Sequence, residues 1–366
     1  MKICFLAGAN SIHSVRWIKF FAERGHQIIW ISLAPPIPEA RDLIKKTRFY
    51  EIKPSPLSDI KGQLAIRHIL SAVQQVKTIL KNEKPDILHA HSLGTYGLVG
   101  ALSRFHPLIF TVWGSDILLA RGLKKIIIQY VIRRGDYYTC DGYNAGKRLV
   151  ELGANPQKIK QVRFGIDTTR FKLAASGKKP ETQLRIISLR NLEPIYNVET
   201  LIRAAAIAVK ESPDMEFIIA GNGREREKLE RLTEEFGLKE KVKFIGRYKE
   251  NDLPQILSEA DIYVTTALSE SGLAASTSEA MAVGLPVVAT DSGDNKIWIE
   301  GKGGFVIPPR NPKLMAEKIL YLARNESMRK QFGAYNRKIT FEKNDYRTEM
   351  GKMENMYEKL LSHSNK

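Results

Sequence analysis

Short apolar runs and amphipathic stretches alternate along almost the whole 366-residue chain. In the first half, each apolar run is followed by polar residues or by apolar residues at helical spacing. The pattern predicts strands at residues 2–7, 26–32, 86–91, 108–116, 137–140 and 159–167, helices at 14–24 and 66–80, and a glycine-containing helix after 91. Strands that alternate with helices are typical of parallel α/β winding.

The same alternation begins again after residues 174–183, a polar stretch with glycine and proline that is typical of a linker. In the second half, strands are predicted at 184–191, 216–223, 242–248, 261–267, 285–290 and 303–309, with helices at 198–210, 224–236 and 253–260 and two more near the C-terminus. We therefore predict an α/β protein with one domain at 1–173 and another at 184–340.

A short polar helix precedes the strand predicted at 285–290. Ser276 and Glu279 have the spacing of a capping box, which predicts that the helix begins at Ser276 with Glu279 reaching back to it. The helix is expected to stop at Gly284. A capping box accounts for Glu279 but not for the brevity of the helix, which a ligand at its N-terminus would explain.

Length and composition fit two globular domains, with 43% hydrophobic and 27% charged residues. The net charge of +17 is uneven: residues 1–173 carry 27 Lys and Arg against 12 Asp and Glu, and the remainder carries 30 against 28. This asymmetry predicts an anionic partner for the first domain, either a membrane surface, a nucleic acid or a phosphorylated substrate, unless the lysines only keep the surface soluble. Nucleic acid is disfavoured because the aromatic residues do not interleave with the basic ones.

The two cysteines, Cys4 and Cys140, lie far apart in apolar contexts, which favours neither a disulfide framework nor a metal site. The first apolar run stops at Asn10, and we interpret it as a strand rather than a secretion signal. No apolar stretch approaches the roughly 20 residues needed to cross a bilayer. The expected location is the cytoplasm.

In parallel sheets, ligands bind beyond the carboxyl ends of the strands. The loops "AGAN", "LRNLEP", "AGNG", "GRYKE" and "SESG" all follow predicted strands, so they are expected to gather along one cleft. Arg190 lies at such a strand end, where it can hold a phosphate through two parallel hydrogen bonds or form a surface ion pair. The unpaired N–H groups in the first turn of the helix at Ser276 also suit a diphosphate.

Several segments resemble the family 4 retaining glycosyltransferases, also described as glycosyl transferases group 1. The resemblance extends through nearly the whole chain, and the block "SEAMAVGLPVVATDSG" is its most specific part, with "PDILHAHS", "TVWGSD" and "VRFGIDTTRF" in the first half. It implies the GT-B fold, in which two Rossmann-like domains face a central nucleotide-sugar cleft. It also implies a C-terminal helix, here at 341–366, that crosses back to the N-terminal domain.

The resemblance implies a donor site in the second domain and an acceptor site in the first. Glu279 would bind the ribose hydroxyls, Arg190 would stabilise charge on the leaving diphosphate, and backbone amides around Ala275 and Ser276 would hold its oxygens. The remaining implied positions are Gly272 in the glycine-containing turn, Tyr248 in the base pocket and Gly8 in the first loop. The scheme needs no metal and no cofactor, since the nucleotide-sugar is the substrate.

The chain departs from the family pattern at positions that face the sugar and the diphosphate. Ser271 aligns with a glutamate that usually contacts the sugar, while Glu270 is one residue away; Tyr196 lies near the position of the usual lysine. In "TVWGSD", Trp113 can stack on a sugar, and Asp116 either orients an acceptor hydroxyl or caps the next helix.

The pair His89 and His91 alternates along a predicted strand, which favours packing over metal binding. The segment 117–135 is apolar and basic, and it fits either an anionic lipid surface or a buried helix with a solvated edge.

The predicted function is that of a retaining hexosyltransferase. It would move a sugar from a nucleotide-diphosphate donor to a lipid-linked or growing glycan acceptor, in cell-surface polysaccharide or glycolipid biosynthesis. The departing phosphate oxygen would accept the acceptor's proton on the same face. The protein is expected to lie peripherally on the inner face of the cell membrane. Two alternatives remain: a catalytically weak partner subunit that binds nucleotide or lipid, and a nucleotide-sugar epimerase on the same fold.

Overall fold

The computed structural model describes residues 1–52, 63–171 and 183–364. Apart from Gln183, the predicted linker at 174–183 lies outside the described residues. The chain divides into two compact units, one of Met1–Val162 with Met350–Lys366 and the other of Arg163–Glu349. The first unit thus ends at Val162 and not at the expected residue 173, and its C-terminal part begins at Met350 and not at 341.

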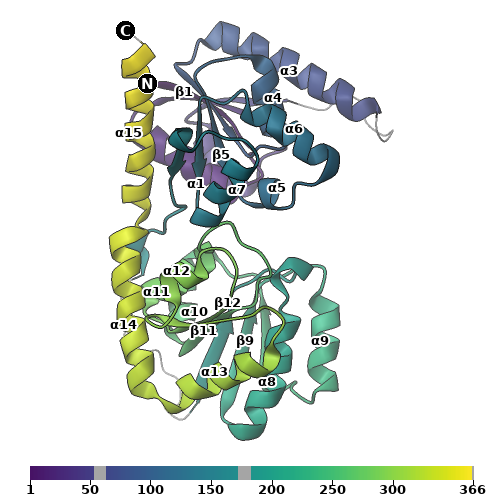
Figure 1. The fold of residues 1–366 in the computed structure, drawn as a ribbon, viewed down its shortest axis with the longest axis vertical. Helices are drawn as coiled ribbons and strands as arrows, with labels where there is room; N and C mark the ends of the chain where they lie inside the picture. The colour runs from purple at the N-terminus through teal and green to yellow at the C-terminus, as the bar shows by residue number, and fades with distance from the viewer. Residues whose placement is uncertain (53–62, 172–182, 365–366) are drawn as a thin grey trace. The chain divides into compact units, whose positions relative to one another are not determined.

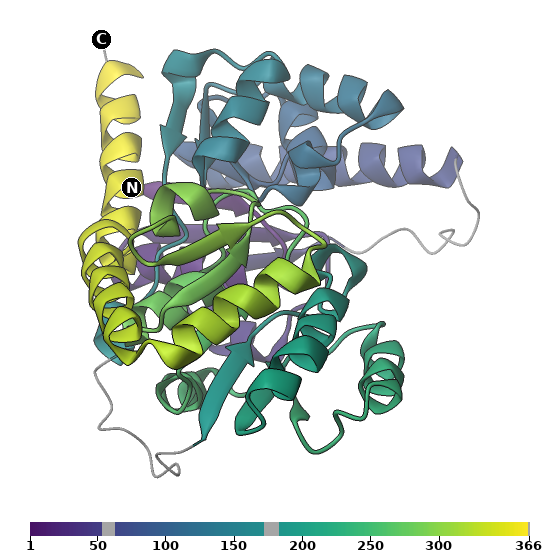
Figure 2. The ribbon, with the colours of Figure 1, turned by 60° about the horizontal axis from the view of Figure 1, so that its bottom comes forward.

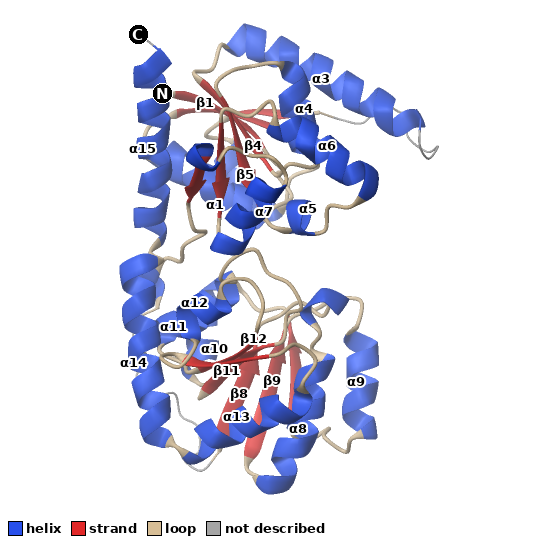
Figure 3. Ribbon diagram, in the orientation of Figure 1, coloured by secondary structure: helices blue, strands red, loops and turns tan. Residues whose placement is uncertain are grey.

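The first unit is built on a seven-stranded parallel sheet (Figure 3). Its order is β3-β2-β1-β4-β5-β6-β7, so the connection reverses direction between β1 and β4. The strands are β1 (Lys2–Leu6), β2 (Gln27–Ser32), β3 (Arg48–Glu51), β4 (Ile87–His91), β5 (Leu108–Val112), β6 (Tyr137–Cys140) and β7 (Ile159–Gln161). The edge strand β3 is too polar to stand out in the sequence.

Helices cover both faces of this sheet (Figure 1). They are α1 (Ile12–Glu23), α2 (Arg41–Ile44), α3 (Gln63–Glu83), α4 (Thr95–Ser103), α5 (Ser115–Leu118), α6 (Gly122–Ile132), α7 (Tyr143–Glu151) and α15 (Tyr346–Ser364). Apolar residues of α3, α4, α6 and α7 share one core with the sheet. On the other face, Phe21 of α1 lies between Phe5 of β1 and Tyr357 of α15, at ring distances of 5.7 and 5.2 Å.

The second unit repeats the design with six parallel strands in the order β10-β9-β8-β11-β12-β13. The strands are β8 (Leu184–Ser188), β9 (Met215–Ala220), β10 (Val242–Gly246), β11 (Ile262–Thr265), β12 (Val287–Thr290) and β13 (Gly304–Ile307). The helices are α8 (Glu199–Glu211), α9 (Arg226–Glu235), α10 (Leu253–Ser258), α11 (Ala275–Val283), α12 (Asn295–Ile299), α13 (Pro312–Arg324) and α14 (Glu326–Lys343). One face packs against α8, α9, α13 and α14, the other against α10, α11 and α12.

The predicted α/β class and the parallel winding are confirmed, but several local predictions are wrong. The strand predicted at 108–116 ends at Val112, and α5 begins at Ser115. The strand predicted at 159–167 ends at Gln161, because Ile166 instead forms an isolated bridge to Asp345. Three helices, not two, follow β13. Among the described residues, no helix combines the length and the apolarity needed to cross a bilayer.

The helix α15 is tied to the first unit by buried polar contacts as well as by apolar packing. The Tyr357 hydroxyl is hydrogen-bonded to Nδ1 of His89 in β4. Nearer the start of the helix, the Glu354 carboxylate accepts from Arg24 Nε at 2.9 Å and lies 2.7 Å from His26 Nε2. In Figures 1 and 2, the yellow C-terminal helix accordingly passes beside the purple start of the chain.

We expect Tyr357→Phe to lower the free energy of unfolding by about 1–3 kcal/mol, because a buried ring nitrogen of His89 loses its partner without a cavity being made. Chemical denaturation of the full chain measures this. Tyr321→Phe is the matched control. Tyr321 is exposed, and the phenylalanine that replaces it keeps the ring contact with Phe305. Equal stability of the two variants would contradict the importance of the His89 contact.

Candidate functional site

The connection of the second sheet reverses direction between β8 and β11, where open parallel sheets bind ligands. Arg190 follows β8, and residues 266–274 follow β11. These two segments are joined by hydrogen bonds: Leu268 N–H donates to the Ile195 carbonyl at 2.8 Å, and Thr266 Oγ1 donates to the Tyr196 carbonyl at 2.7 Å. The fold therefore brings the segments together at the edge predicted to bind ligand.

Arg190 is the central side chain of this edge and is only 7% exposed. Its Nη1 donates to Ser276 Oγ at 3.0 Å, and its Nη2 donates to the Glu270 carboxylate in a direct ion pair. Its Cζ lies 4.1 Å from the centre of the Tyr196 ring. The interpretation of Arg190 as a surface ion pair is therefore wrong, because the guanidinium is enclosed on three sides by protein groups.

The electrostatics of Arg190 follow from this enclosure. Burial alone would lower the pKa of Arg190, but the Glu270 carboxylate and neighbouring tyrosines raise it above its ordinary value. For Glu270, burial raises the pKa, against the lowering effect of Arg190. Arg190 Nε is buried and has no hydrogen-bond partner among the described residues. One N–H donor of a buried cation is thus left for a ligand or a water.

Three glycines let the surrounding loops approach closely. A Cβ on Gly221 would lie 2.3 Å from the Arg190 carbonyl oxygen, and one on Gly223 would lie 2.3 Å from that of Leu192. The glycines of "AGNG" therefore serve packing against the segment of Arg190. Gly293, at φ +57°, does the same for the other segment, since its Cβ would lie 2.2 Å from the Gly272 carbonyl oxygen and 2.7 Å from Glu270 Cβ.

The helix α11 begins one residue earlier than predicted, and the capping box is absent. Its N-cap is Ala274, which makes no side-chain cap hydrogen bond, and Ser276 lies inside the first turn. There the Ser276 hydroxyl accepts from Arg190 and from Tyr263 Oη at 2.9 Å. The N–H groups around Ala275 and Ser276 therefore have no side-chain cap. The predicted end of the helix at Gly284, in the left-handed conformation, is confirmed.

The other predicted residues of the second unit lie near this cluster. Burial raises the pKa of Tyr248, and the Glu279 carboxylate raises it further, while Arg190 lowers it. Glu279 is half-buried, as is Ser271, and Gly272 is buried. The acid that reaches Arg190 belongs to Glu270 and not to the position of Ser271.

In the first unit, Gly8 follows β1, where a Cβ would lie 2.6 Å from Asn10 Oδ1. Asp116 is buried, and its carboxylate accepts the backbone N–H groups of Leu93 at 2.8 Å and Trp113 at 3.2 Å. Burial raises the pKa of Asp116, and these hydrogen bonds oppose that rise. Asp116 thus holds together the loops after β4 and β5.

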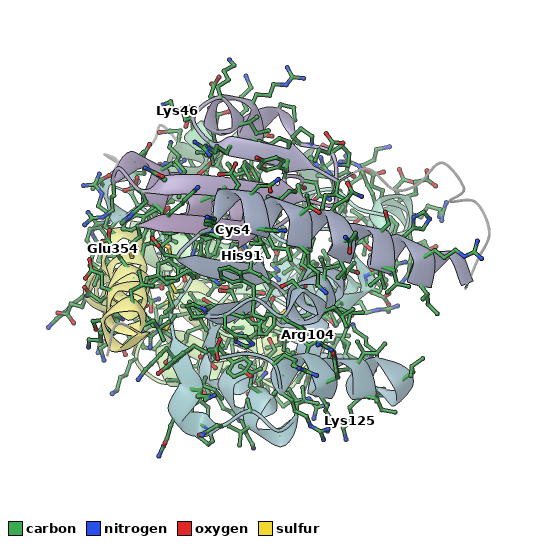
Figure 4. The ribbon with its side chains drawn as sticks, turned by 90° about the horizontal axis from the view of Figure 1, so that it is seen from above. Cys4, Lys46, His91, Arg104, Lys125 and Glu354 are labelled. Carbon is green, nitrogen blue, oxygen red and sulfur yellow. The ribbon has the colours of Figure 1, made fainter. Side chains whose placement is uncertain are left out.

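Aromatic side chains surround His91, which lies at the end of β4 and is labelled in Figure 4. Its ring centre lies 5.4 Å from that of Trp113 and 5.5 Å from that of Trp17, and His13 stacks on Trp113 at 5.6 Å. Burial lowers the pKa of His91 to about 3, so its ring is neutral at physiological pH. His91 Nδ1 lies 3.2 Å from Ser14 Oγ, and its buried Nε2 has no partner in the described part of the chain.

His89 packs inside the first unit. Besides Tyr357, it contacts Thr111 Oγ1 at 2.6 Å through Nε2, so hydroxyl groups engage both of its ring nitrogens. Within the ranges that the structure describes, no three His, Cys, Asp or Glu side chains gather as metal ligands would.

Comparison with known families decides what this pair of units is. The profile of glycosyl transferases group 1 matches residues 169–339, and that of glycosyl transferase 4-like proteins matches residues 2–141. The chain belongs to the group 1 glycosyltransferases. The predicted family is thereby confirmed, and each of the two profiles matches one of the two α/β units.

Curated relatives carry consistent names. The chain is 28% identical to WcaL of Salmonella typhimurium, a glycosyltransferase assigned by name to colanic acid biosynthesis, over 65% of the chain and 62% of WcaL. It is 27% identical to the amylovoran biosynthesis glycosyltransferase AmsK of Erwinia amylovora, over 49% of the chain and 46% of AmsK. The matches thus span about three fifths of WcaL and less than half of AmsK.

Solved structures confirm the GT-B fold. The Anabaena protein HepE in complex with UDP superposes with a TM-score of 0.80 at 19% identity, over 98% of this chain and all of HepE. Sucrose-phosphate synthase from Thermosynechococcus elongatus gives 0.85 at 16% identity, over 99% of this chain and all of that one. At these identities the likeness concerns the fold alone.

The sequence reasoning missed Glu270 and the role of Tyr196. Both lie in the connections between strands and helices. There the spacing of residues along the sequence does not indicate which side chain points toward Arg190. The apolar ring of Tyr196 next to a strand-end arginine was the available signal, since guanidinium groups stack on aromatic faces.

We expect Tyr196→Leu to destabilise the second unit by about 1 kcal/mol, because Arg190 loses its stacked ring, while Tyr196→Phe changes stability little. Urea denaturation of both variants measures the difference. If the phenylalanine variant lost as much as the leucine variant, the hydroxyl and not the ring would support Arg190.

Proposed function

We propose that the chain is a retaining glycosyltransferase, which moves a sugar from a nucleotide-diphosphate donor to a lipid-linked or growing glycan acceptor in cell-surface polysaccharide biosynthesis. The names of WcaL and AmsK support the polysaccharide assignment. The complexes of HepE with UDP and with UDP-glucose support a nucleotide-sugar donor, with UDP as the first nucleotide to test.

The observation that carries the proposal is the buried Arg190 with a free Nε donor, beside the uncapped first turn of α11. A helix N-terminus and a guanidinium both favour a diphosphate. In a site of low polarity, fixed donors stabilise the charge that develops on the leaving diphosphate more strongly than water would. Arg190 and the N–H groups around Ala275 and Ser276 would supply these donors.

Glu279 and Tyr248 would hold the nucleoside. A carboxylate can accept both ribose hydroxyls, and the tyrosine ring can line the base pocket. With the donor fixed in this way, the departing phosphate oxygen would take the proton of the acceptor hydroxyl on the same face, so retention requires no separate general base. The residues of the chain then contribute positioning and charge stabilisation.

The first unit would bind the acceptor, and Trp113 is the proposed stacking surface for a sugar ring. Its ring is only half-buried, and the ring of its neighbour His91 is neutral. Neutral aromatic groups suit an uncharged sugar face. Asp116 would act by holding the loop of Trp113 in place.

The acceptor's lipid would lie near α6. This helix packs inward through Ile128, Val131 and Ile132, but it exposes Leu123 at 72% and Ile126 at 63%. Lys124 and Lys125 lie beside these apolar side chains and are exposed, as Figure 4 shows for Lys125. Apolar and basic groups on one exposed surface favour an anionic membrane, on which the protein would lie peripherally.

The donor site is tested by nucleotide binding to Glu279→Gln. A thermal-shift panel of UDP, GDP and ADP identifies the nucleotide for the wild type. We expect Glu279→Gln to weaken binding of that nucleotide about tenfold, since hydrogen bonds to a charged group contribute about 1.5–3 kcal/mol. Stability should change little, because Glu279 does not cap the helix.

Glu317→Gln, on an exposed glutamate of α13, is the control for loss of one charge. Unfolding of Glu279→Gln without ligand would show a structural role and count against the site. Tight nucleotide binding by the wild type without sugar transfer would favour the partner-subunit alternative, and sugar isomerisation without acceptor would favour an epimerase.

The membrane surface is tested by replacing Lys124, Lys125, Arg133 and Arg134 with glutamine. Each basic residue contributes about 1 kcal/mol near an anionic surface, so we expect binding to phosphatidylserine-containing vesicles to fall at least tenfold in sedimentation assays. Replacing four exposed lysines of the second unit, Lys239, Lys243, Lys330 and Lys338, gives the matched control. Unchanged vesicle binding by the first variant would overturn the membrane proposal.

A further inference from the structure

We propose that Glu270 is an internal counter-anion of Arg190 that opposes the nucleoside diphosphate product and so promotes its release. The inference rests on the proposed function for one point, namely that the diphosphate binds at Arg190. It assigns a positioning and specificity role to Glu270, which lies one residue before Ser271, the position of the family's sugar-contacting glutamate.

The contacts of Arg190 limit where a diphosphate can bind. Nη1 and Nη2 already donate to Ser276 and Glu270, and the Tyr196 ring covers a face of the guanidinium. A ligand can therefore bind the N–H group of Nε, and it must share the donors of Nη1 and Nη2 with Ser276 and Glu270. A diphosphate that binds there comes close to the Glu270 carboxylate, because both anions engage the same planar group.

The loop holds Glu270 in this place. The chain at Gly293 packs so closely that a Cβ there would lie 2.7 Å from Glu270 Cβ, and Asp294 N–H donates to the Gly272 carbonyl at 3.2 Å. The Glu270 side chain is only 17% exposed. The backbone and Cβ of Glu270 are therefore held in place, and the carboxylate stays beside Arg190 unless its side chain rotates or the loops from 270 to 272 and from 291 to 294 move apart.

The charge of the ligand changes during the proposed reaction. A nucleotide-sugar has no terminal phosphate monoester, whereas the nucleoside diphosphate product has one, which loses a second proton with a pKa of about 6. At neutral pH the product is therefore more negative than the donor. A fixed carboxylate at Arg190 repels the product more strongly than the donor, so it weakens product binding selectively.

By the family resemblance, Tyr196 lies near the position of the usual lysine, and among the described residues Arg190 is the cation that lowers the pKa of Glu270. Where one cation faces the carboxylate, the carboxylate has a larger effect on the net potential of the site than it would beside two cations. Glu270 and Tyr196 together thus make a site that binds the diphosphate weakly and releases it readily.

The test compares Glu270→Gln with the wild type in calorimetric binding of UDP and UDP-glucose to the full chain, or of the GDP or ADP pair if the panel selects that base. We expect the Kd of the nucleoside diphosphate to fall about tenfold in Glu270→Gln, with a change below about threefold for the sugar conjugate. Glu259→Gln is the matched control, since Glu259 pairs with Arg185 at 3.1 Å at the opposite end of the same sheet. Both of its Kd values should equal those of the wild type.

An unchanged or higher Kd for the nucleoside diphosphate in Glu270→Gln overturns the inference, and the proposed function survives because the wild type still binds nucleotide. A wild type that binds none of the nucleotides overturns both. The two failures are therefore distinguishable.

If Glu270→Gln does not fold because Arg190 is left unpaired, the comparison moves to Arg190→Gln against the double variant Arg190→Gln/Glu270→Gln, in which no buried charge is stranded. The double variant is expected to bind the nucleoside diphosphate at least as tightly as Arg190→Gln. Weaker binding by the double variant would show that Glu270 contacts the ligand favourably and would overturn the inference.

Discussion

The buried guanidinium of Arg190 is the constraint on which the second unit's loop edge depends. An unpaired charge in such a place costs about 3–5 kcal/mol, so the loops must supply partners before they can pack. Ser276 comes from α11, Glu270 from the loop after β11 and Tyr196 from the loop after β8. The arginine therefore joins three separate segments. The glycines at 221, 223 and 293 let neighbouring loops pack closely against two of these segments.

Under the proposed function, this arrangement makes one residue serve both folding and chemistry. The contacts that keep Arg190 charged and oriented in the absence of ligand are also those that an incoming anion must share. A site with a lysine beside the arginine would attract the diphosphate more strongly. Here Arg190 is instead paired directly with the Glu270 carboxylate, so a change in either residue is expected to alter ligand affinity.

The sequence predicted the elements of both sheets well, because buried parallel strands are continuous apolar runs and the helices between them have clear periodicity. It failed where polar side chains decide the structure. The capping box at Ser276 was wrong because Arg190, far away in the sequence, takes up the serine hydroxyl. The strand at 159–167 was overextended because Ile166 forms an isolated bridge opposite Asp345, through hydrogen bonds with Asn344 and Tyr346, which no local pattern indicates.

The site was predictable only in part, for the same reason. Arg190 and Ser276 were found from their places at a strand end and a helix start, and the structure brings them into contact. Glu270 was set aside in favour of Ser271, because an alignment gives positions and not side-chain directions. Asp116 was expected either to orient an acceptor hydroxyl or to cap the next helix. Its carboxylate holds two loop backbones, which no local pattern indicates, and the acceptor role stays a prediction.

The return of α15 to the first unit has a consequence for how the protein is made. Tyr357 and Glu354 contribute to a sheet face whose first strand begins at Lys2. A ribosome therefore delivers the whole second unit before it delivers the helix that covers the first. Since domains fold as units during synthesis, the second unit can reach its native state earlier than the one that precedes it. Until α15 has been synthesised, the aromatic residues that it contacts on that face, such as Phe21, lack its cover.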